Sequence, residues 1–310
     1  MKISVFLPPW GETATPENFD LFAEVVDDGT FHAMWIGDHV AVPLSVDSTY
    51  HYNSERRSPF DPQLPLFEPL TLAAYLAART SHVRIGMSVF ILAMRSPVEA
   101  AKALGCIDAL AGGRLVVGIG AGWMAEEFAL LDADYATRGP RTDEGIAILR
   151  HLWNGNEDGF IGAHHTLAPV QLTPLPSQPI PIVIGGNTAA AMKRAVTLGD
   201  GWHALRIDPE RLGTEIVGLR QRLDARGRDP QSFTIITRDT LVETTANAQG
   251  PSDTIGDPVW DAARRRLDAF AKAGVDEFIV EFPGLPMKQQ TEWFQWLSSR
   301  LTRETTIQRA

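Results

Sequence analysis

The sequence predicts an α/β protein, and within that class a closed (β/α)8 barrel, or TIM barrel, in which each strand is followed by a helix. Short apolar runs alternate with longer amphipathic segments almost from one end of the chain to the other, which gives eight strand and helix units. No break in composition divides these units, and 310 residues is a common length for one such barrel. A doubly wound open sheet is the alternative arrangement.

Helix-start signals mark the first units. Residues 3–7 form an apolar strand, and residues 16–28 form a helix with Thr15 as its N-cap and Pro16 in the first turn. The second strand is predicted at residues 34–37.

The third and fourth strands are predicted at residues 83–90 and 115–120. The helix between them begins with the capping box Ser96-Pro97-Val98-Glu99 and ends at Gly112-Gly113. A strong helix follows at residues 141–153.

The second half of the chain repeats this pattern with shorter strands. The predicted strands are residues 180–184, 202–205, 233–236 and 277–282. The predicted helices are residues 189–198, a helix opening at Asp208-Pro209-Glu210 and a last helix containing Trp293 and Trp296, followed by a polar tail at residues 302–310.

Two stretches fall outside the repeat. Residues 43–69, after the second strand, and residues 155–180, before the fifth strand, are long and punctuated by proline. Segments of this length in a compact domain are usually lids or binding loops. We therefore expect one barrel domain over residues 1–310, with these two insertions as lid segments.

Composition and charge exclude several classes of protein. An apolar content of 44% and a charged content of 21% are those of an ordinary globular protein. The net charge of −10 argues against a nucleic-acid binder, which needs clustered Lys and Arg. The single cysteine, Cys106, excludes a disulfide framework and a cysteine metal site. No signal region precedes the first strand, and no apolar stretch approaches the ~20 residues of a membrane helix, so we expect a cytoplasmic protein.

Asp38 and His39 end the apolar run of the second strand. Taken alone, Asp38 is explained as the cap of the next turn and His39 as an ordinary residue at the barrel rim. However, α/β enzymes place their reacting groups at strand ends, and the imidazole side chain titrates near neutral pH. The other strand ends that meet them are Ser88-Val89, Gly120-Ala121-Gly122-Trp123, Gly185-Gly186-Asn187-Thr188 and Trp202-His203. Glycine lets backbone approach a ligand closely, and N–H groups at helix starts bind anions. The strand ends therefore predict a ligand pocket.

Three common kinds of site do not match the chain. The run Gly118-x-Gly120-x-Gly122 lies on the fourth strand, is followed by bulky residues and has no acidic ribose ligand ~20 residues later, so it is not a dinucleotide fingerprint. His164 and His165 are adjacent and cannot share a helix face, which disfavours zinc. The Gly-x-Ser-x-Gly elbow of a serine hydrolase is absent.

Taken together, the motifs resemble the luciferase-like monooxygenase superfamily, whose TIM barrels bind FMN or the deazaflavin coenzyme F420, and most closely its F420-dependent oxidoreductase branch. The resemblance covers most of the chain and is specific for the superfamily, but much less specific for F420 against FMN. The motifs are Phe6-Leu7-Pro8, Trp35-Ile36-Gly37-Asp38-His39-Val40, Arg95-Ser96-Pro97, Asp108 to Arg114, Gly118 to Trp123 with Glu126-Glu127, Arg138 to Glu144, Pro181 to Asn187 and Gly199 to His203.

The resemblance implies a role for each strand end. Asp38 lies near the flavin-type ring, His39 faces its reactive carbon as proton donor or acceptor, and a non-proline cis peptide at Ser88-Val89 bulges against the ring. The residues implied to hold the ribityl-phosphate arm are Gly120, Ala121, Gly122, Trp123, Gly185, Gly186, Asn187 and Thr188. Arg138 and Arg141 are candidates to neutralise phosphate, with ion-paired surface residues as the alternative. Trp10 and Trp202 are candidate pocket walls, with barrel core as the alternative.

The activity that the resemblance implies is hydride transfer between F420 and a small organic substrate, with His39 managing the proton. One alternative is an FMN-dependent monooxygenase that uses O2 and reduced flavin delivered by a partner reductase. Another is a non-catalytic flavin-binding barrel. The resemblance also implies a homodimer and a flavin or F420 reductase as a further partner, with no nucleic acid or membrane partner.

Overall fold

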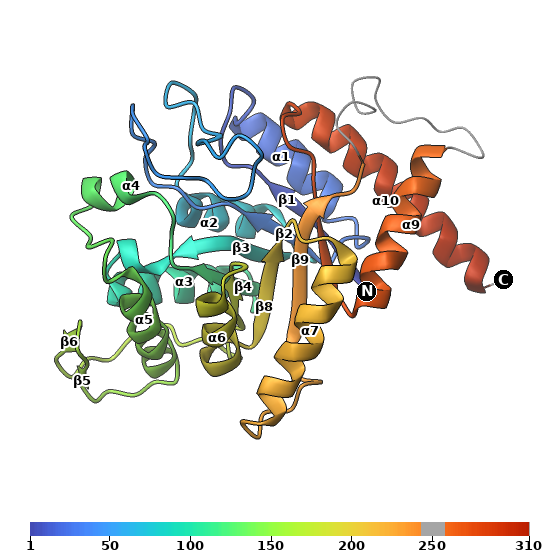
Figure 1. The fold of residues 1–310 in the computed structure, drawn as a ribbon. Helices are drawn as coiled ribbons and strands as arrows, with labels where there is room; N and C mark the ends of the chain where they lie inside the picture. Colours follow the sequence, from blue (N-terminus) through green and yellow to red (C-terminus); the bar gives the residue numbers. More distant parts are fainter. Residues whose placement is uncertain (243–257, 310) are drawn as a thin grey trace.

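The computed structural model describes residues 1–242 and 258–309, and its main strands close into a parallel barrel of eight (Figure 1). These strands are β1 (Lys2–Leu7), β2 (Ala33–Ile36), β3 (Arg84–Ile91), β4 (Leu115–Gly120), β7 (Ile182–Gly185), β8 (Gly201–Leu205), β9 (Thr234–Thr240) and β10 (Glu277–Glu281). They follow one another around the barrel in chain order, and β10 pairs with β1 to close it. The predicted (β/α)8 barrel is confirmed, and the open-sheet alternative is wrong.

The helices form a layer outside the barrel (Figure 1). They are α1 (Pro16–Val26), α2 (Pro69–Arg79), α3 (Pro97–Leu110), α4 (Ala125–Leu130), α5 (Arg138–Trp153), α6 (Ala189–Leu198), α7 (Pro209–Asp224), α9 (Pro258–Ala273) and α10 (Met287–Arg309), with a 3-10 turn η1 (Leu92–Met94) before α3. Within the described ranges, none of these helices combines the length and the apolar character that crossing a membrane requires.

Side-chain caps explain where five helices begin. Thr15, Glu68, Ser96, Thr188 and Asp208 each accept a hydrogen bond from the backbone N–H three residues further on. Such a cap satisfies one of the N–H groups that the first helical turn leaves without a partner. The predicted caps Thr15 and Ser96 are confirmed.

Two apolar layers hold the barrel together. The barrel interior contains Phe6, Ala33, Trp35, Val116, Val183, Ile236 and Ile279, all buried. A larger cluster fills the space between the strands and the helices. Inside the barrel, Glu277 accepts hydrogen bonds from Ser4 Oγ (2.6 Å) and Trp35 Nε1 (2.7 Å), and burial raises the pKa of this carboxyl.

Two long connections depart from the barrel repeat. Residues 37–68 run from β2 to α2 and form the blue loops above the barrel in Figure 1. Residues 154–181 connect α5 to β7 and contain a small antiparallel hairpin of β5 (Phe160–Ile161) and β6 (Thr166–Leu167). They overlap the segments at residues 43–69 and 155–180 that were predicted as insertions. The first connection, called the β2–α2 loop below, reaches the functional site.

Some element boundaries differ from the prediction. α5 begins at Arg138 rather than at residue 141, because Pro140 lies in the first turn, where its missing N–H has no helical partner to lose. β9 continues to Thr240, and its polar residues are paired: Arg238 with Ser88 inside the barrel and Asp239 with Arg266 of α9. The predicted polar tail is wrong, since α10 continues to Arg309. The sequence pattern did not predict α2, α4 and α9.

Candidate active site

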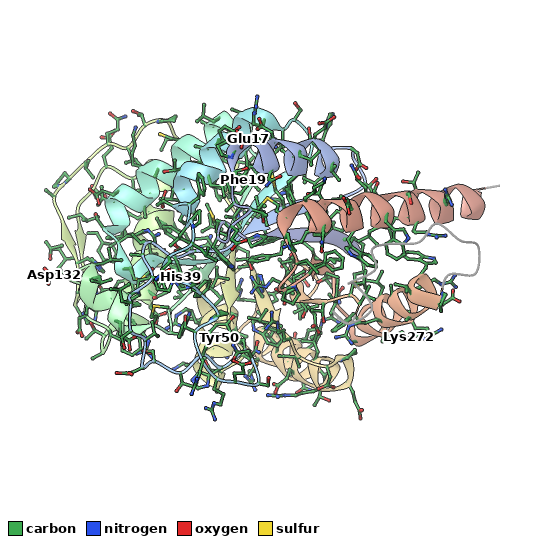
Figure 2. All side chains as sticks on the ribbon, turned by 90° about the horizontal axis from the view of Figure 1, so that it is seen from above. Glu17, Phe19, His39, Tyr50, Asp132 and Lys272 are labelled. Carbon is green, nitrogen blue, oxygen red and sulfur yellow. The ribbon has the colours of Figure 1, made fainter. Side chains whose placement is uncertain are left out.

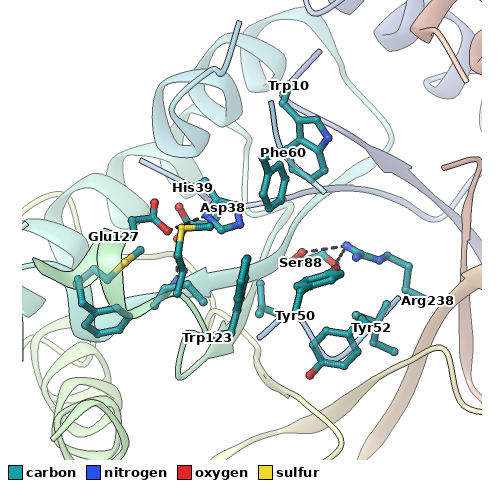
Figure 3. A pocket seen from close by; sticks show the side chains of 18 residues that line it. Trp10, Asp38, His39, Tyr50, Tyr52, Phe60, Ser88, Trp123, Glu127 and Arg238 are labelled. Atoms are coloured by element: carbon teal, nitrogen blue, oxygen red, sulfur yellow. Dashed lines mark hydrogen bonds and ion pairs between the residues drawn. The ribbon is translucent and has the colours of Figure 1, made fainter. Parts of the chain in front are cut away.

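A cavity of about 100 Å³ opens at the carboxyl ends of the barrel strands (Figure 3). Its lining comes from the segment after β1, from the β2–α2 loop, from β3 and η1, from the β4–α4 connection and α4, and from β8 and β9. The lining residues are Trp10, Gly37, Asp38, His39, Tyr50, Tyr52, Phe60, Ser88, Val89, Ile91, Met94, Gly122, Trp123, Met124, Glu127, Phe128, Leu205 and Arg238. Viewed from above, His39 lies toward the middle of the molecule, whereas Asp132 and Lys272 lie near its edges (Figure 2).

His39 is held by a carboxylate from another unit of the barrel. His39 Nδ1 lies 2.7 Å from Glu127 Oε2, and both residues are buried. The other oxygen, Glu127 Oε1, accepts the N–H groups of Val40 (2.6 Å) and Ala41 (3.3 Å). Because an ionised carboxylate only accepts hydrogen bonds, Nδ1 carries the proton in the neutral imidazole and Nε2 keeps a lone pair. Glu127 therefore fixes both the position and the tautomer of His39.

Asp38 is fully engaged by its own neighbours. Its carboxylate accepts from both Nη atoms of Arg95 (2.8 and 2.7 Å) and from the Ile91 N–H (2.7 Å). Burial alone would lower the pKa of Arg95, but the Asp38 carboxylate raises it, so this guanidinium keeps its charge. Asp38 thus fastens the end of β3 to the end of β2, which supports the pocket wall.

The Ser88–Val89 peptide bond is cis, as the resemblance implied, and the register of β3 against β4 shifts between Met87 and Phe90. Val89 fills the space over two glycines. A Cβ on Gly120 would lie 2.5 Å from Val89 Cγ2, and one on Gly185 would lie 2.6 Å from Val89 Cγ1. Both distances are far inside van der Waals contact. The absence of a side chain at Gly120 and Gly185 thus makes room for Val89, and their expected contact with a cofactor arm stays a prediction.

A polar network supports this wall from inside the barrel. Ser88 Oγ lies 3.0 Å from His203 Nε2 and accepts from Arg238 Nη1 (2.9 Å), which also donates to the Ser88 carbonyl (3.1 Å) (Figure 3). His203 Nδ1 lies 3.1 Å from the Ala204 carbonyl oxygen, so it donates there and Nε2 accepts from Ser88. Burial, with the nearby Arg238 charge, lowers the pKa of His203 from 6.5 to about 3. His203 is therefore neutral.

The remaining strand-end residues divide between the pocket and its surroundings. Gly122 and Trp123 line the cavity, whereas Ala121 is not part of its lining. Asn187 hydrogen-bonds the Leu205 backbone through both side-chain atoms, and the exposed Thr188 caps α6.

Trp202 requires a correction as a pocket wall. It is completely buried in the core outside the barrel, and its indole N–H donates to the Gly186 carbonyl (2.8 Å). Because side chains alternate along a strand, Trp202 faces the helices while its neighbour His203 faces the barrel interior. Trp10 lines the pocket, as expected for a wall.

The two predicted phosphate partners lie in different places. Arg138 approaches the Gly122 carbonyl through Nε (3.4 Å) and packs over the Tyr135 ring at 3.8 Å. Arg141 instead lines a separate surface cavity with Arg95, His164 and His165, and its buried Nε has no hydrogen-bond partner within the described part of the chain.

The sequence reading gave no role to several residues that the structure brings to the pocket. Tyr50, Tyr52 and Phe60 come from the β2–α2 loop, and the Phe60 ring lies 4.3 Å from the His39 ring. Glu127 belongs to the Glu126-Glu127 motif of the family resemblance, but no role was predicted for its side chain. Arg238 interrupts the apolar run of β9. A charged residue within a barrel strand was the sequence signal that could have identified it as a site residue.

Comparison with known proteins agrees with this geometry. A sequence profile of the luciferase-like monooxygenase family matches residues 1–277. The chain is 33% identical over 218 residues to the uncharacterized protein Rv0940c of Mycobacterium tuberculosis, covering 70% of this chain and 75% of that one. It is 28% identical over 222 residues to the F420-dependent glucose-6-phosphate dehydrogenase of Kineococcus radiotolerans, covering 70% and 61%. The crystal structure of the monooxygenase RslO1 from Streptomyces bottropensis superposes with a TM-score of 0.73 at 20% identity, covering 98% and 100%.

The chain therefore belongs to the luciferase-like monooxygenase family. It is an oxidoreductase of that family.

Proposed function

We propose that this protein transfers hydride between coenzyme F420 and a small organic substrate, with His39 as the catalytic acid or base. One observation carries the proposal: the Glu127 carboxylate holds a buried imidazole at the pocket with its Nε2 lone pair uncommitted. Hydride transfer at a carbon bearing oxygen needs a proton to move at that oxygen, and His39 Nε2 is suited to take it or return it. The likeness to an F420-dependent dehydrogenase supports the choice of cofactor.

The residues at the pocket suit a flat ring with an anionic arm. The wall formed by Ser88 and Val89 is fixed from behind by Gly120 and Gly185, so it presents a rigid apolar surface to a ring. When bound, the deazaflavin would supply the site that accepts or releases the hydride.

The phosphate of such a cofactor would be held at the start of α6. Helix N-termini carry N–H groups without partners and bind anions, and residues 188–190 are exposed at this end of the barrel. Arg138 lies beside the neighbouring strand end at Gly122. Arg194 of α6 donates to the Gly139 carbonyl (3.1 Å), which brings the start of α5 against α6.

The β2–α2 loop would keep water away from the reacting atoms. Tyr50 packs against Trp123 with ring centroids 5.0 Å apart, and Phe60 covers His39. Cofactor pockets generally measure roughly 300–1,000 Å³, so the loop must move outward from its present position to admit a ring. It would then close over the bound molecules.

Cofactor titration tests the proposal. Binding of F420 and FMN would be followed by absorbance and by mass spectrometry of the retained cofactor, with His39→Ala and His39→Asn beside the wild type. We expect F420 to bind, and both variants to keep binding while turnover falls about 10²–10⁴-fold. Tight FMN binding without any response to F420, or full activity of His39→Ala, would refute the proposal.

An FMN-dependent monooxygenase is the second candidate, supported by the description of the family to which the chain belongs. The two functions differ in chemistry, because reduced FMN reacts with O2 and deazaflavin does so poorly. Substrate-dependent O2 consumption with reduced FMN would favour this candidate.

A further inference from the structure

A second cavity of about 500 Å³ lies beside the first at the same end of the barrel. The two cavities share the lining residues Trp10, Tyr50, Phe60 and Arg238, so these side chains lie between them. Its other walls come from the segments after β1 and β10 and from the β2–α2 loop. It is large enough for a small organic molecule, whereas the first cavity is not.

Much of the lining of the second cavity is apolar and aromatic. Its apolar lining includes Phe6, Trp10, Phe60, Phe282, Leu285 and Met287. Trp10 packs edge-on against Phe60 with centroids 4.8 Å apart, and Phe6 lies 5.8 Å from Trp10. Such a wall favours an aromatic or branched aliphatic body over a sugar or another strongly hydrated molecule.

The cavity lining also carries two guanidinium groups and one carboxylate, and the Arg238 guanidinium packs over the Phe6 ring at 4.0 Å. Glu281 Oε1 accepts from Arg206 Nε (2.7 Å), and Glu281 Oε2 lies 3.2 Å from Arg238 Nε without forming a hydrogen bond. Arg238 is 8% exposed, and its Nη1 is used by Ser88. Asp239, which follows Arg238 on β9, is paired with Arg266 (2.7 Å).

This cluster has one positive charge more than its own carboxylate balances. Glu12, the other acid at the cavity, is exposed to solvent, which screens it. Buried charge is stable in proteins mainly when it is paired and hydrogen-bonded. Among the described residues, Nη2 of Arg206 and Nη2 of Arg238 make no hydrogen bond, so each has donors to offer a ligand.

We propose that the second cavity is the substrate site and that it selects a monoanionic carboxylate with an apolar body, whose carboxylate is bound by Arg206 and Arg238. A planar guanidinium matches a carboxylate in shape, and a single negative charge balances the cluster. The shared side chains Trp10, Tyr50 and Phe60 put the apolar body next to the cavity that contains His39. This assignment rests on the proposed function only in calling the ligand a substrate.

Calorimetric titration of the purified protein without cofactor tests the assignment. The probes are 3-phenylpropionate and its uncharged amide, which have the same body. Because hydrogen bonds to charged groups are the stronger ones, we expect the carboxylate to bind roughly ten-fold or more tightly than the amide. Equal binding of the two, or no binding of either, would overturn the assignment.

Two substitutions are expected to act in opposite directions. Arg206→Gln leaves Arg238 and Glu281 balanced, so the preference for the carboxylate should disappear. Glu281→Gln raises the local charge, so the carboxylate should bind several-fold more tightly. Glu12→Gln is the matched control for the second change and should alter binding less than two-fold. If Arg206→Gln retained the full preference, or Glu281→Gln weakened carboxylate binding while its thermal unfolding stayed normal, the assignment would be wrong.

The two proposals fail in different ways. If the carboxylate binds as expected but F420 does not bind, the assignment of the cavity is supported and the proposed hydride transfer is refuted. If F420 binds and supports turnover but the carboxylate preference is absent, the proposed function is kept and the assignment is refuted.

Discussion

The hydrogen bond between Glu127 and His39 gives the sharpest test of how this site works. In Glu127→Gln the amide oxygen can still accept the Val40 N–H, so the β2 end keeps its support. The amide nitrogen then faces His39 Nδ1, which must accept instead of donate. The proton moves to Nε2, and the imidazole presents the wrong tautomer to the pocket.

The size of the effect follows from the bond that is lost. The contact between His39 Nδ1 and Glu127 Oε2 is 2.7 Å long and buried, and hydrogen bonds to charged groups contribute about 1.5–3 kcal/mol. Since ~1.4 kcal/mol corresponds to a factor of ten in rate, kcat should fall roughly 10–150-fold. The KM of the cofactor should change little, because Glu127 holds the imidazole and not the ring.

The assay is steady-state turnover of F420 by its absorbance, together with ¹⁵N NMR of the histidine ring to read which nitrogen carries the proton. Glu126→Gln is the matched control, because the neighbouring Glu126 accepts from the Asp47 and Ser48 N–H groups (2.8 and 2.9 Å) instead of from His39. It should leave the tautomer unchanged. The double variant His39→Ala with Glu127→Gln should be no slower than His39→Ala alone. A Glu127→Gln enzyme within two-fold of the wild type, or additive losses in the double variant, would refute the reasoning.

Three further predictions concern stability. Gly185→Ala should lower the free energy of unfolding, measured by urea denaturation, by about 1–3 kcal/mol, since the new Cβ meets Val89 at 2.6 Å. Adding Val89→Ala should restore most of the lost stability, and a double variant that stays as unstable as Gly185→Ala would contradict the packing explanation. His203 is neutral when folded, with a pKa of about 3 against 6.5 unfolded, so the unfolded chain binds one proton more as the pH falls from about 6.5 to about 3. Stability should drop by up to ~1.4 kcal/mol per pH unit over that window, and His203→Gln should have a correspondingly flatter profile; identical profiles would count against it. Arg114 donates to the Thr80 carbonyl (2.8 Å) and hydroxyl (3.0 Å) and to three further carbonyls. Arg114→Met should therefore lower the free energy of unfolding in urea by about 2–3 kcal/mol. A loss below about 0.5 kcal/mol would show that water replaces these hydrogen bonds.

The sequence carried enough information for the barrel and for the position of His39 at the pocket, and the physical reasons are plain. Strands buried on both faces read as continuous apolar runs, and Asp38 and His39 stand out because they end one of them. Helix starts at Thr15 and Ser96 follow from local hydrogen bonds that span only three residues.

The parts that failed depend on contacts between distant segments. His39 and Glu127 are 88 residues apart in the chain, so nothing local announces their pairing. Gly120 and Gly185 indicated a close approach to the backbone, but that Val89 from another strand is one group that approaches them could not be read from the sequence. The homodimer, the reductase partner and the cytoplasmic location stay predictions.

The packing of Val89 against its glycines also limits how this enzyme can diversify. A side chain at Gly120 or Gly185 would collide with Val89, so a substitution of either glycine requires a compensating change at Val89. The β2–α2 loop and the segment after β10 supply much of the lining of the larger cavity. Among their described residues, such a restriction falls on Gly37, whose Cβ would meet Trp10 at 2.5 Å, and on Gly284, which has a φ of +79°. New substrate preferences would therefore be acquired by substitutions in these loops, while the wall formed by Ser88 and Val89 stays unchanged.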